Sequence, residues 1–130
     1  MKYEGMLKDG ALEGKTILIT GGGTGLGKSI GKYCIELGAN LIITSRRQGI
    51  LDETAKELSN LGPGEIFPIS SDVRNVDDVE TVINKSLEKF GKIDSLLNNA
   101  AGNFISPTER LSPKGFDVVV DIVLKGTYNY

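Results

Sequence analysis

The sequence predicts an α/β fold built on a doubly wound parallel sheet with helices on both faces. Short runs rich in Ile, Leu and Thr alternate four times with segments in which apolar residues recur at helical spacing. The runs are apolar throughout, which is typical of strands covered on both faces. Because crossovers between parallel strands are right-handed, the expected strand order is 3-2-1-4.

Four predicted strands occupy residues 16–20, 40–45 and 65–70 and part of 92–100. The first two, TILIT and NLIITS, are rich in the β-branched residues that suit a buried strand. The third run contains Pro68, whose nitrogen cannot donate to a ladder. We therefore expect the third strand to lie towards an edge of the sheet.

Helix boundaries are indicated by capping residues as well as by periodicity. Gly38 follows the first helical segment in the C′ position. Asn75, with Asp78 at N3, marks the start of the third helix, and Ser112 with Pro113 at N1 marks the start of the fourth. The apolar stripes predicted to face the core are Leu26, Ile30, Tyr33, Cys34 and Leu37; Leu51, Ala55 and Leu58; Val76, Val79, Ile83, Leu87 and Phe90; and Phe116, Val119, Val120 and Val123.

Composition excludes several classes of function. The chain of 130 residues fits one domain, and we expect residues 1–14 to form a loosely held arm. Fifteen basic and 17 acidic residues give a net charge of −2, which offers no reason to propose a nucleic-acid or membrane-surface partner. With Cys34 as the only cysteine and no histidine, no disulfide framework or metal site is expected. The mixed, charged first residues and the lack of a long apolar run predict a cytosolic (cytoplasmic) protein without a membrane span.

The stretch TGGGTGLG, residues 20–27, joins the first predicted strand to the first helix. Bare backbone at such a turn lets a pyrophosphate approach closely, and the helix N-terminus supplies N–H donors and a positive dipole end. The alternative is a tight turn whose glycines supply only positive φ angles. The position between strand and helix favours nucleotide binding over that alternative.

The end of the second strand bears on which nicotinamide cofactor is bound. It reads TSRR, with Ser45, Arg46 and Arg47 and no carboxylate until Asp52. A carboxylate here would favour NAD, whereas a guanidinium suits the 2′-phosphate of NADP. We therefore predict NADP(H), held by Arg46. Both arginines could instead be solvated at the helix start, which we expect for Arg47.

Three segments together resemble the short-chain dehydrogenase/reductase family. The glycine motif has that family's T-G-x-x-x-G-x-G spacing, SDV at 71–73 resembles its segment with an adenine-contacting Asp, and NNAAG at 98–102 resembles its NNAG motif. The resemblance implies a Rossmann-like NAD(P)-binding domain over 15–130. The cofactor-binding residues it implies, together with the second-strand residues, are Thr20, Gly21, Gly23, Thr24, Gly25, Leu26, Gly27, Ser45, Arg46, Asp72, Val73, Asn98 and Ala100.

Residues 98–112 and 121–127 more specifically resemble the 2,4-dienoyl-CoA reductases of fatty-acid β-oxidation. That resemblance implies NADPH-dependent reduction of a fatty dienoyl-CoA thioester to an enoyl-CoA. It places Asn103 at the thioester carbonyl as the catalytic residue, Phe104 in the acyl pocket, and Arg74 and Ser112 near CoA. The alternatives are a loop cap for Asn103, a core position for Phe104, a helix cap for Ser112 and a solvated Arg74.

This sequence departs from the general family pattern in two respects. Val123 stands where most short-chain dehydrogenases carry an active-site asparagine. The dienoyl-CoA reductase branch resembles this chain in lacking that asparagine. The family's Tyr-x-x-x-Lys pair does not occur, and neither Tyr128 nor Tyr130 replaces it. We therefore expect an N-terminal part with four of about six strands and no hydride transfer by this chain alone.

Two alternatives to a 2,4-dienoyl-CoA reductase stay open. The chain could belong to another member of the family, such as a 3-oxoacyl thioester reductase, or it could be a non-catalytic dinucleotide-binding module. Full-length members of the family commonly form tetramers, so a homo-oligomer is expected of the whole protein. Because the fourth strand would lack its neighbour, the chain made alone is expected to show poor solubility, local disorder or non-native association.

Overall fold

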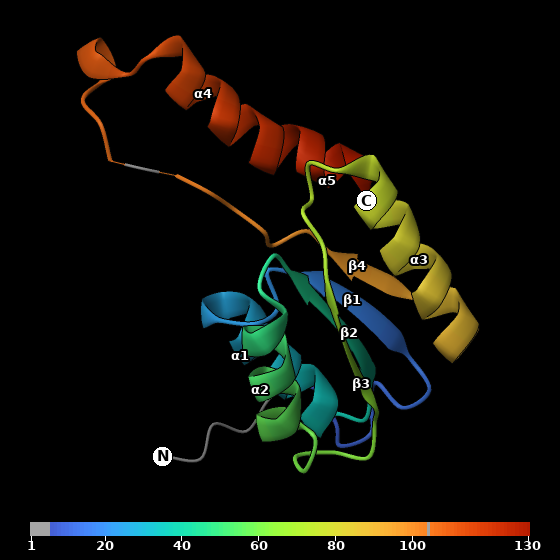
Figure 1. The fold of residues 1–130 in the computed structure, drawn as a ribbon. Helices are drawn as coiled ribbons and strands as arrows, with labels where there is room; N and C mark the ends of the chain where they lie inside the picture. Colours follow the sequence, from blue (N-terminus) through green and yellow to red (C-terminus); the bar gives the residue numbers. More distant parts are fainter. Residues whose placement is uncertain (1–5, 104) are drawn as a thin grey trace.

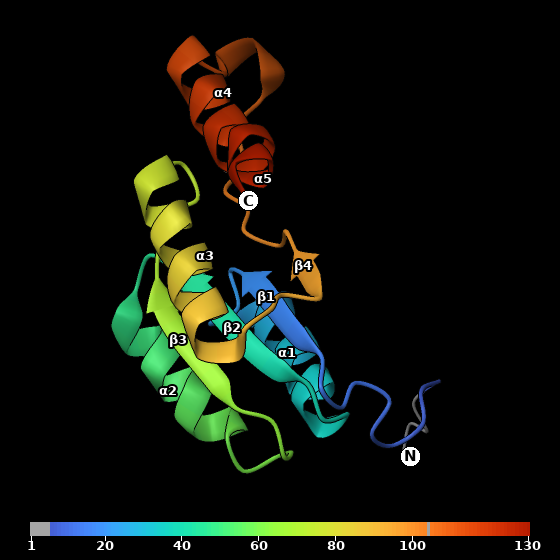
Figure 2. The ribbon, with the colours of Figure 1, turned by 90° about the vertical axis from the view of Figure 1, so that its right-hand side faces the viewer.

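The computed structural model describes residues 6–103 and 105–130. Its four strands form one parallel sheet in the order β3-β2-β1-β4, so the predicted topology is confirmed. Helices cover both faces of this sheet, with α1 and α2 on one face and α3 on the other (Figures 1 and 2). The strands are β1 Thr16–Thr20, β2 Asn40–Ser45, β3 Ile66–Ser70 and β4 Ser95–Leu97; the long helices are α1 Gly25–Glu36, α2 Gln48–Leu58 and α3 Val76–Phe90.

The core forms on both sides of β2, the strand between β1 and β3. Leu41, Ile42 and Ile43 are completely buried because successive side chains point to opposite faces. Leu41 and Ile43 pack under α1 and α2, and Ile42 packs with Val82 of α3. Pro68 lies in β3, which pairs only with β2 among the described residues, so its predicted edge position is confirmed.

The predicted helix caps are largely confirmed. Gly38 adopts a φ of +97° after α1, and the Ser112 hydroxyl accepts from the backbone N–H of Gly115 at 3.1 Å at the start of α4 (Pro113–Val120). Asn75 accepts from the N–H of Asp77 at 3.1 Å. Asp78 does not form a reciprocal capping hydrogen bond with the backbone of Asn75. Its carboxylate instead accepts from the backbone N–H of Asp72 at 3.0 Å.

The predicted core face of α1 is wrong for three of its five residues, whereas Cys34 and Leu37 are buried as predicted. Leu26, Ile30 and Tyr33 are 76%, 40% and 39% exposed. The helix instead packs on the sheet through small residues: a Cβ added at Gly31 would already touch Leu41 Cδ1 at 3.5 Å and Ile19 Cδ1 at 3.6 Å. A search for regularly spaced apolar side chains misses this face of α1, because its glycines have no side chain to count. The buried residues of α1 are Gly27, Gly31, Cys34 and Ile35.

The last helical segment projects from the sheet (Figure 1). It follows a short 3₁₀ turn, η1 (Thr108–Arg110), and consists of α4, a π-helical turn η2 (Asp121–Lys125) and α5 (Gly126–Asn129). No residue of α4 is buried, and Phe116 is 58% exposed, so the predicted stripe does not face a core within this chain. The segment returns to the body at its end, where Asn129 Nδ2 donates to the Val73 carbonyl at 2.8 Å.

Part of the predicted N-terminal arm contacts the domain. The backbone N–H of Leu12 donates to the Leu37 carbonyl at 3.0 Å, and the Leu12 side chain packs against the core cluster under α1. The boundary between residues 14 and 15 stays a prediction. In the part of the chain that the structure describes, no helix has the length and apolar character needed to cross a membrane.

Strand β4 offers one edge without a partner among the described residues, and Leu96 there is 40% exposed. We expect the 130-residue chain, made alone, to self-associate through this edge, and Leu96→Lys to reduce the association because charged edge residues oppose strand pairing. Light scattering across a concentration series measures the effect. Leu61→Lys, at a residue of equal 40% exposure, is the matched control. A monomeric, cooperatively melting unmodified chain would contradict the expectation.

Candidate functional site

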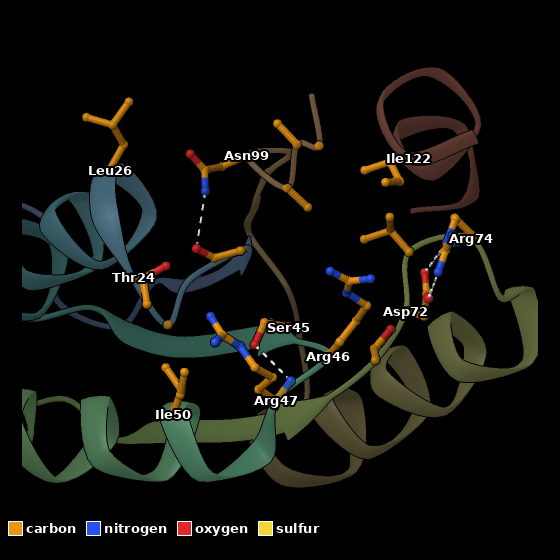
Figure 3. Close-up of a pocket in the computed structure, with 17 residues that line it drawn as sticks. Thr24, Leu26, Ser45, Arg46, Arg47, Ile50, Asp72, Arg74, Asn99 and Ile122 are labelled. Atoms are coloured by element: carbon orange, nitrogen blue, oxygen red, sulfur yellow. Dashed lines mark hydrogen bonds and ion pairs between the residues drawn. The ribbon is translucent and has the colours of Figure 1, made fainter. Parts of the chain in front are cut away.

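A cavity of about 400 Å³ lies at the carboxyl ends of the four strands (Figure 3). Segments far apart in the sequence meet there, which is the expected position of a ligand in an open parallel sheet. Its lining residues are Gly21, Gly23, Thr24 and Leu26; Ser45, Arg46, Arg47 and Ile50; Ser71, Asp72, Val73 and Arg74; Asn99, Ala100, Ala101 and Gly102; and Ile122.

The glycine loop is held against the sheet by its own backbone. Gly21 has a φ of +68°, and its N–H donates to the Thr44 carbonyl at 2.7 Å. Gly27 opens the first turn of α1, where a Cβ would collide with the Gly21 carbonyl oxygen and lie 2.6 Å from Asn99 Nδ2. The predicted residues Gly25 and Gly27 thus shape the loop without lining the cavity, whereas Gly21, Gly23, Thr24 and Leu26 line it.

The N-terminus of α1 is open. Thr24 occupies the N-cap but makes no side-chain capping bond, and the first turn carries no acidic residue. Within the described residues, no hydrogen bond is made by the backbone N–H groups of residues 23–26. Unpaired donors at the positive end of a helix dipole suit an anion such as a pyrophosphate.

The end of β4 is tied to the glycine loop by Thr20 and Asn99. The Thr20 hydroxyl accepts from the backbone N–H groups of Asn99 at 3.0 Å and Ala100 at 2.9 Å. Asn99 Nδ2 donates to the carbonyls of Thr20 at 3.0 Å and Gly21 at 3.3 Å. Thr20 is therefore a buried clamp rather than a lining residue. Asn98 lies outside the lining and donates to the Thr127 carbonyl at 3.5 Å, whereas its neighbour Asn99, which the sequence analysis did not single out, lines the cavity.

Two arginines lie at the end of β2. Arg46 and Arg47 are both solvent-exposed and both line the cavity, and neither forms an ion pair with another described residue. Their guanidinium groups lie on either side of Ser45 in the view of Figure 3. The cavity thus combines open N–H donors with exposed positive charge, a set of groups that fits a phosphorylated nucleotide.

Asp72 and Arg74 bind each other. Asp72 Oδ1 accepts from Arg74 Nε at 2.9 Å, and its Oδ2 accepts from Arg74 Nη2 at 2.5 Å. These hydrogen bonds lower the pKa of Asp72 from 3.8 to about 2, with a smaller contribution from the charge of Arg46. The same pair raises the pKa of Arg74. Sequence analysis assigned the two residues to different ligands, and the structure makes them one charged unit.

The π-helical turn closes one side of the cavity. Ile122 lies so close to Gly102 that a Cβ there would be 2.7 Å from Ile122 Cδ1. Val73 is 9% exposed and packs against Gly126. A Cβ added at Gly126 would lie only 2.6 Å from Val73 Cγ2. Nothing in the sequence pattern indicated a π turn, so Ile122 was not predicted.

The predicted substrate residues are not brought together. Arg74 lines the cavity, Asn103 is exposed and outside the lining, and Ser112 caps α4. The prediction for Phe104 lies outside the described residues. Among the residues that the structure describes, no cluster of Cys, Asp and Glu could hold a metal ion.

A family model for short chain dehydrogenases matches residues 15–130. The chain belongs to the short-chain dehydrogenase family. This membership agrees with the open sheet and with the glycine loop at its carboxyl edge.

Several curated proteins similar to this chain are named as 2,4-dienoyl-CoA reductases. A probable 2,4-dienoyl-CoA reductase 3 of Caenorhabditis elegans is 48% identical over 95% of this chain and 40% of its own length. A peroxisomal 2,4-dienoyl-CoA reductase of Arabidopsis thaliana is 41% identical over 94% of this chain and 41% of its own. The chain thus spans about 40% of the length of these relatives.

A crystal structure of a short chain dehydrogenase from Bacillus anthracis superposes with a TM-score of 0.84 at 45% identity. The match covers 89% of this chain and 48% of the other. The likeness therefore extends over most of this chain and about half of the other.

A side chain at Gly27 is expected to disrupt the loop of this short-chain dehydrogenase. Gly27→Ala brings a Cβ against the Gly21 carbonyl and Asn99, and forcing such overlap lowers the free energy of unfolding by about 1–3 kcal/mol. Urea denaturation in the Leu96→Lys background measures it. Gly49→Ala is the control, because no atom lies within 4 Å of a Cβ there. Equal effects of the two changes would contradict the close approach.

The Asp72–Arg74 pair is expected to make the free energy of unfolding depend on pH. Because the pKa of Asp72 falls to about 2 on folding, the pair stabilises the fold fully above about pH 4 and loses its effect as pH falls towards 2. Arg74→Ala is expected to return the carboxyl pKa towards its ordinary range, which a carbon-13 NMR titration of Asp72 measures. Arg110→Ala, at an exposed arginine on η1, should leave that titration unchanged. An unaltered pKa in Arg74→Ala would show that another group holds the carboxylate ionised.

Proposed function

We propose that this chain is the cofactor-binding part of an NADPH-dependent reductase of 2,4-dienoyl-CoA thioesters, acting in unsaturated fatty-acid β-oxidation. One observation carries the cofactor assignment: a single cavity joins the open N-terminus of α1 to Arg46 at the end of β2. The first feature suits a pyrophosphate and the second a 2′-phosphate. The substrate assignment is supported by relatives named as 2,4-dienoyl-CoA reductases at 48% and 41% identity.

The residues present fit NADP(H), which supplies a hydride when bound. We assign the pyrophosphate to the backbone of residues 21–27, including Leu26. Ser45 and Arg46 would hold the 2′-phosphate, and Asp72 with Val73 would lie at the adenine. In this proposal Thr20, Asn98 and Ala100 keep the end of β4 in place beside the cofactor; Thr20 does so through its hydrogen bonds to the backbone N–H groups of Asn99 and Ala100.

The substrate side of the proposal rests on the family resemblance. Asn103 would donate to the thioester carbonyl, where its hydrogen bond strengthens as negative charge develops on the oxygen. Arg74 and Ser112 would lie near CoA, and Phe104 would line the acyl pocket. Val123 stands where most members of the family carry an asparagine, which favours the dienoyl-CoA branch over a 3-oxoacyl thioester reductase.

The 130 residues contain no Tyr-x-x-x-Lys pair, so we propose that this chain alone binds cofactor but does not transfer hydride. Activity, homo-oligomer formation and the acyl-CoA partner are proposed for the whole protein. A cytoplasmic location stays a prediction, since one of the relatives described above is a peroxisomal reductase.

Cofactor choice is tested first on the chain itself. Arg46→Ala is expected to weaken NADP⁺ binding about 10- to 100-fold, the effect of losing a charge-assisted hydrogen bond, while NAD⁺ binding changes little. Isothermal titration measures both, with Arg110→Ala as the control. Equal loss of the two cofactors in Arg46→Ala would contradict the assignment of the 2′-phosphate.

The reaction is tested on the whole protein. NADPH oxidation is followed with a 2,4-dienoyl-CoA and with a 3-oxoacyl-CoA, and the first is expected to be the better substrate. Preference for the 3-oxoacyl thioester would favour the other reductase class. Turnover of either thioester by the 130-residue chain would overturn the proposal that this part alone is inactive.

A further inference from the structure

We propose that Thr54 of α2 is a positioning residue for the glycine loop, one that orients the peptide unit between Gly23 and Thr24 so that the Thr24 N–H is directed to a bound phosphate. This inference rests on the proposed function in one respect, that the ligand is a dinucleotide. Its structural part, the clamp on the loop, stands on contacts within the chain.

The Thr54 hydroxyl donates to the Gly23 carbonyl at 2.8 Å, between residues 31 positions apart. Thr54 is only 3% exposed. A threonine within a helix commonly turns its hydroxyl to the carbonyl four residues earlier on its own helix. Here the Thr54 hydroxyl donates to the glycine loop, so the hydrogen bond connects α2 to another element instead of lying within α2.

The bonded carbonyl belongs to the same planar unit as the Thr24 N–H. In a trans peptide the C=O of one residue and the N–H of the next point in opposite directions. Holding the Gly23 carbonyl towards buried Thr54 therefore turns the Thr24 N–H away from α2. Thr24 lines the cavity, and its N–H makes no hydrogen bond within the described residues.

The peptide unit between Gly23 and Thr24 needs a hydrogen bond to fix its orientation, because the residue before it is a glycine. Gly23 has no Cβ to restrict its dihedral angles, so rotation of the Gly23–Thr24 peptide is sterically easy. The neighbouring carbonyls of Thr20 and Gly21 are already held by Asn99. Packing also brings the loop onto α2, since a Cβ at Gly23 would lie 3.2 Å from Leu51 Cδ2. Packing sets the distance between loop and helix, and the Thr54 hydroxyl sets the direction of the peptide.

Two substitutions separate the hydroxyl from the bulk of the side chain. Thr54→Val keeps the shape and removes the hydroxyl, whereas Thr54→Ser keeps the hydroxyl and removes the methyl group. Isothermal titration is run with NADP⁺, which has a pyrophosphate, and with adenosine 2′-monophosphate, which lacks it. We expect Thr54→Val to weaken NADP⁺ about tenfold, the loss of one hydrogen bond, with adenosine 2′-monophosphate unchanged and Thr54→Ser within about twofold of the unmodified chain.

Equal weakening of both ligands in Thr54→Val, or a loss in Thr54→Ser as large as in Thr54→Val, would overturn the proposal in favour of a purely structural role. The free protein provides a second readout: the carbonyl carbon-13 shift of Gly23 should move in Thr54→Val and return in Thr54→Ser. An unmoved shift overturns the clamp whatever the binding results. If the shift moves as expected but the unmodified chain binds neither ligand, the proposed function fails and the phosphate role fails with it, while the clamp itself is supported.

Discussion

The close approach of three backbone segments at Gly21, Gly27 and Asn99 is the constraint on which the site depends. Side-chain nitrogen of Asn99 lies 2.9 Å from the position of a Cβ on Gly21 and 2.6 Å from one on Gly27. A Cβ at Gly27 would also collide with the Gly21 carbonyl oxygen, and one at Gly21 would lie 3.2 Å from Ala100 Cα, so a side chain at either glycine would require the backbone to shift. The loop, the start of α1 and the end of β4 therefore keep one arrangement, and the cavity is formed between them.

That arrangement also decides the electrostatics of the site. The first turn of α1 has no side-chain cap and its sequence has no acidic residue, while Asp72, a carboxylate that lines the cavity, is neutralised by Arg74. Arg46 and Arg47 add positive charge on an adjacent strand end. A chain with a net charge of −2 thus presents a locally positive cavity, and local charge rather than total charge decides which ligand is attracted.

The sequence predicted most of the fold because its strands are short, uniformly apolar and separated by helices. The edge position of Pro68 and the caps at Asn75 and Ser112 follow from local chemistry that tertiary contacts do not override, and the strand order follows from the right-handedness of crossovers between parallel strands. The face of α1 could not be predicted in this way: Leu26, Ile30 and Tyr33 have the right period, yet the helix packs through Gly27 and Gly31. The same limit applies to the site. Thr54 and Ile122 are ordinary helix residues in the sequence, and only a tertiary hydrogen bond and a π turn bring them to the loop and the cavity.

The two halves of the candidate site differ in how they are supported. Residues assigned to the cofactor stand on strand ends or on a loop clamped by Thr20, Thr54 and Asn99, so their positions follow from the sheet. Asn103 and Ser112 belong instead to the segment that leads from β4 to α4, a helix with no buried residue. Few contacts hold that segment to the sheet, so its geometry depends on what α4 and η2 pack against. In the function proposed above, cofactor binding would therefore be possible for this chain by itself, whereas thioester binding would need partners for the projecting helix.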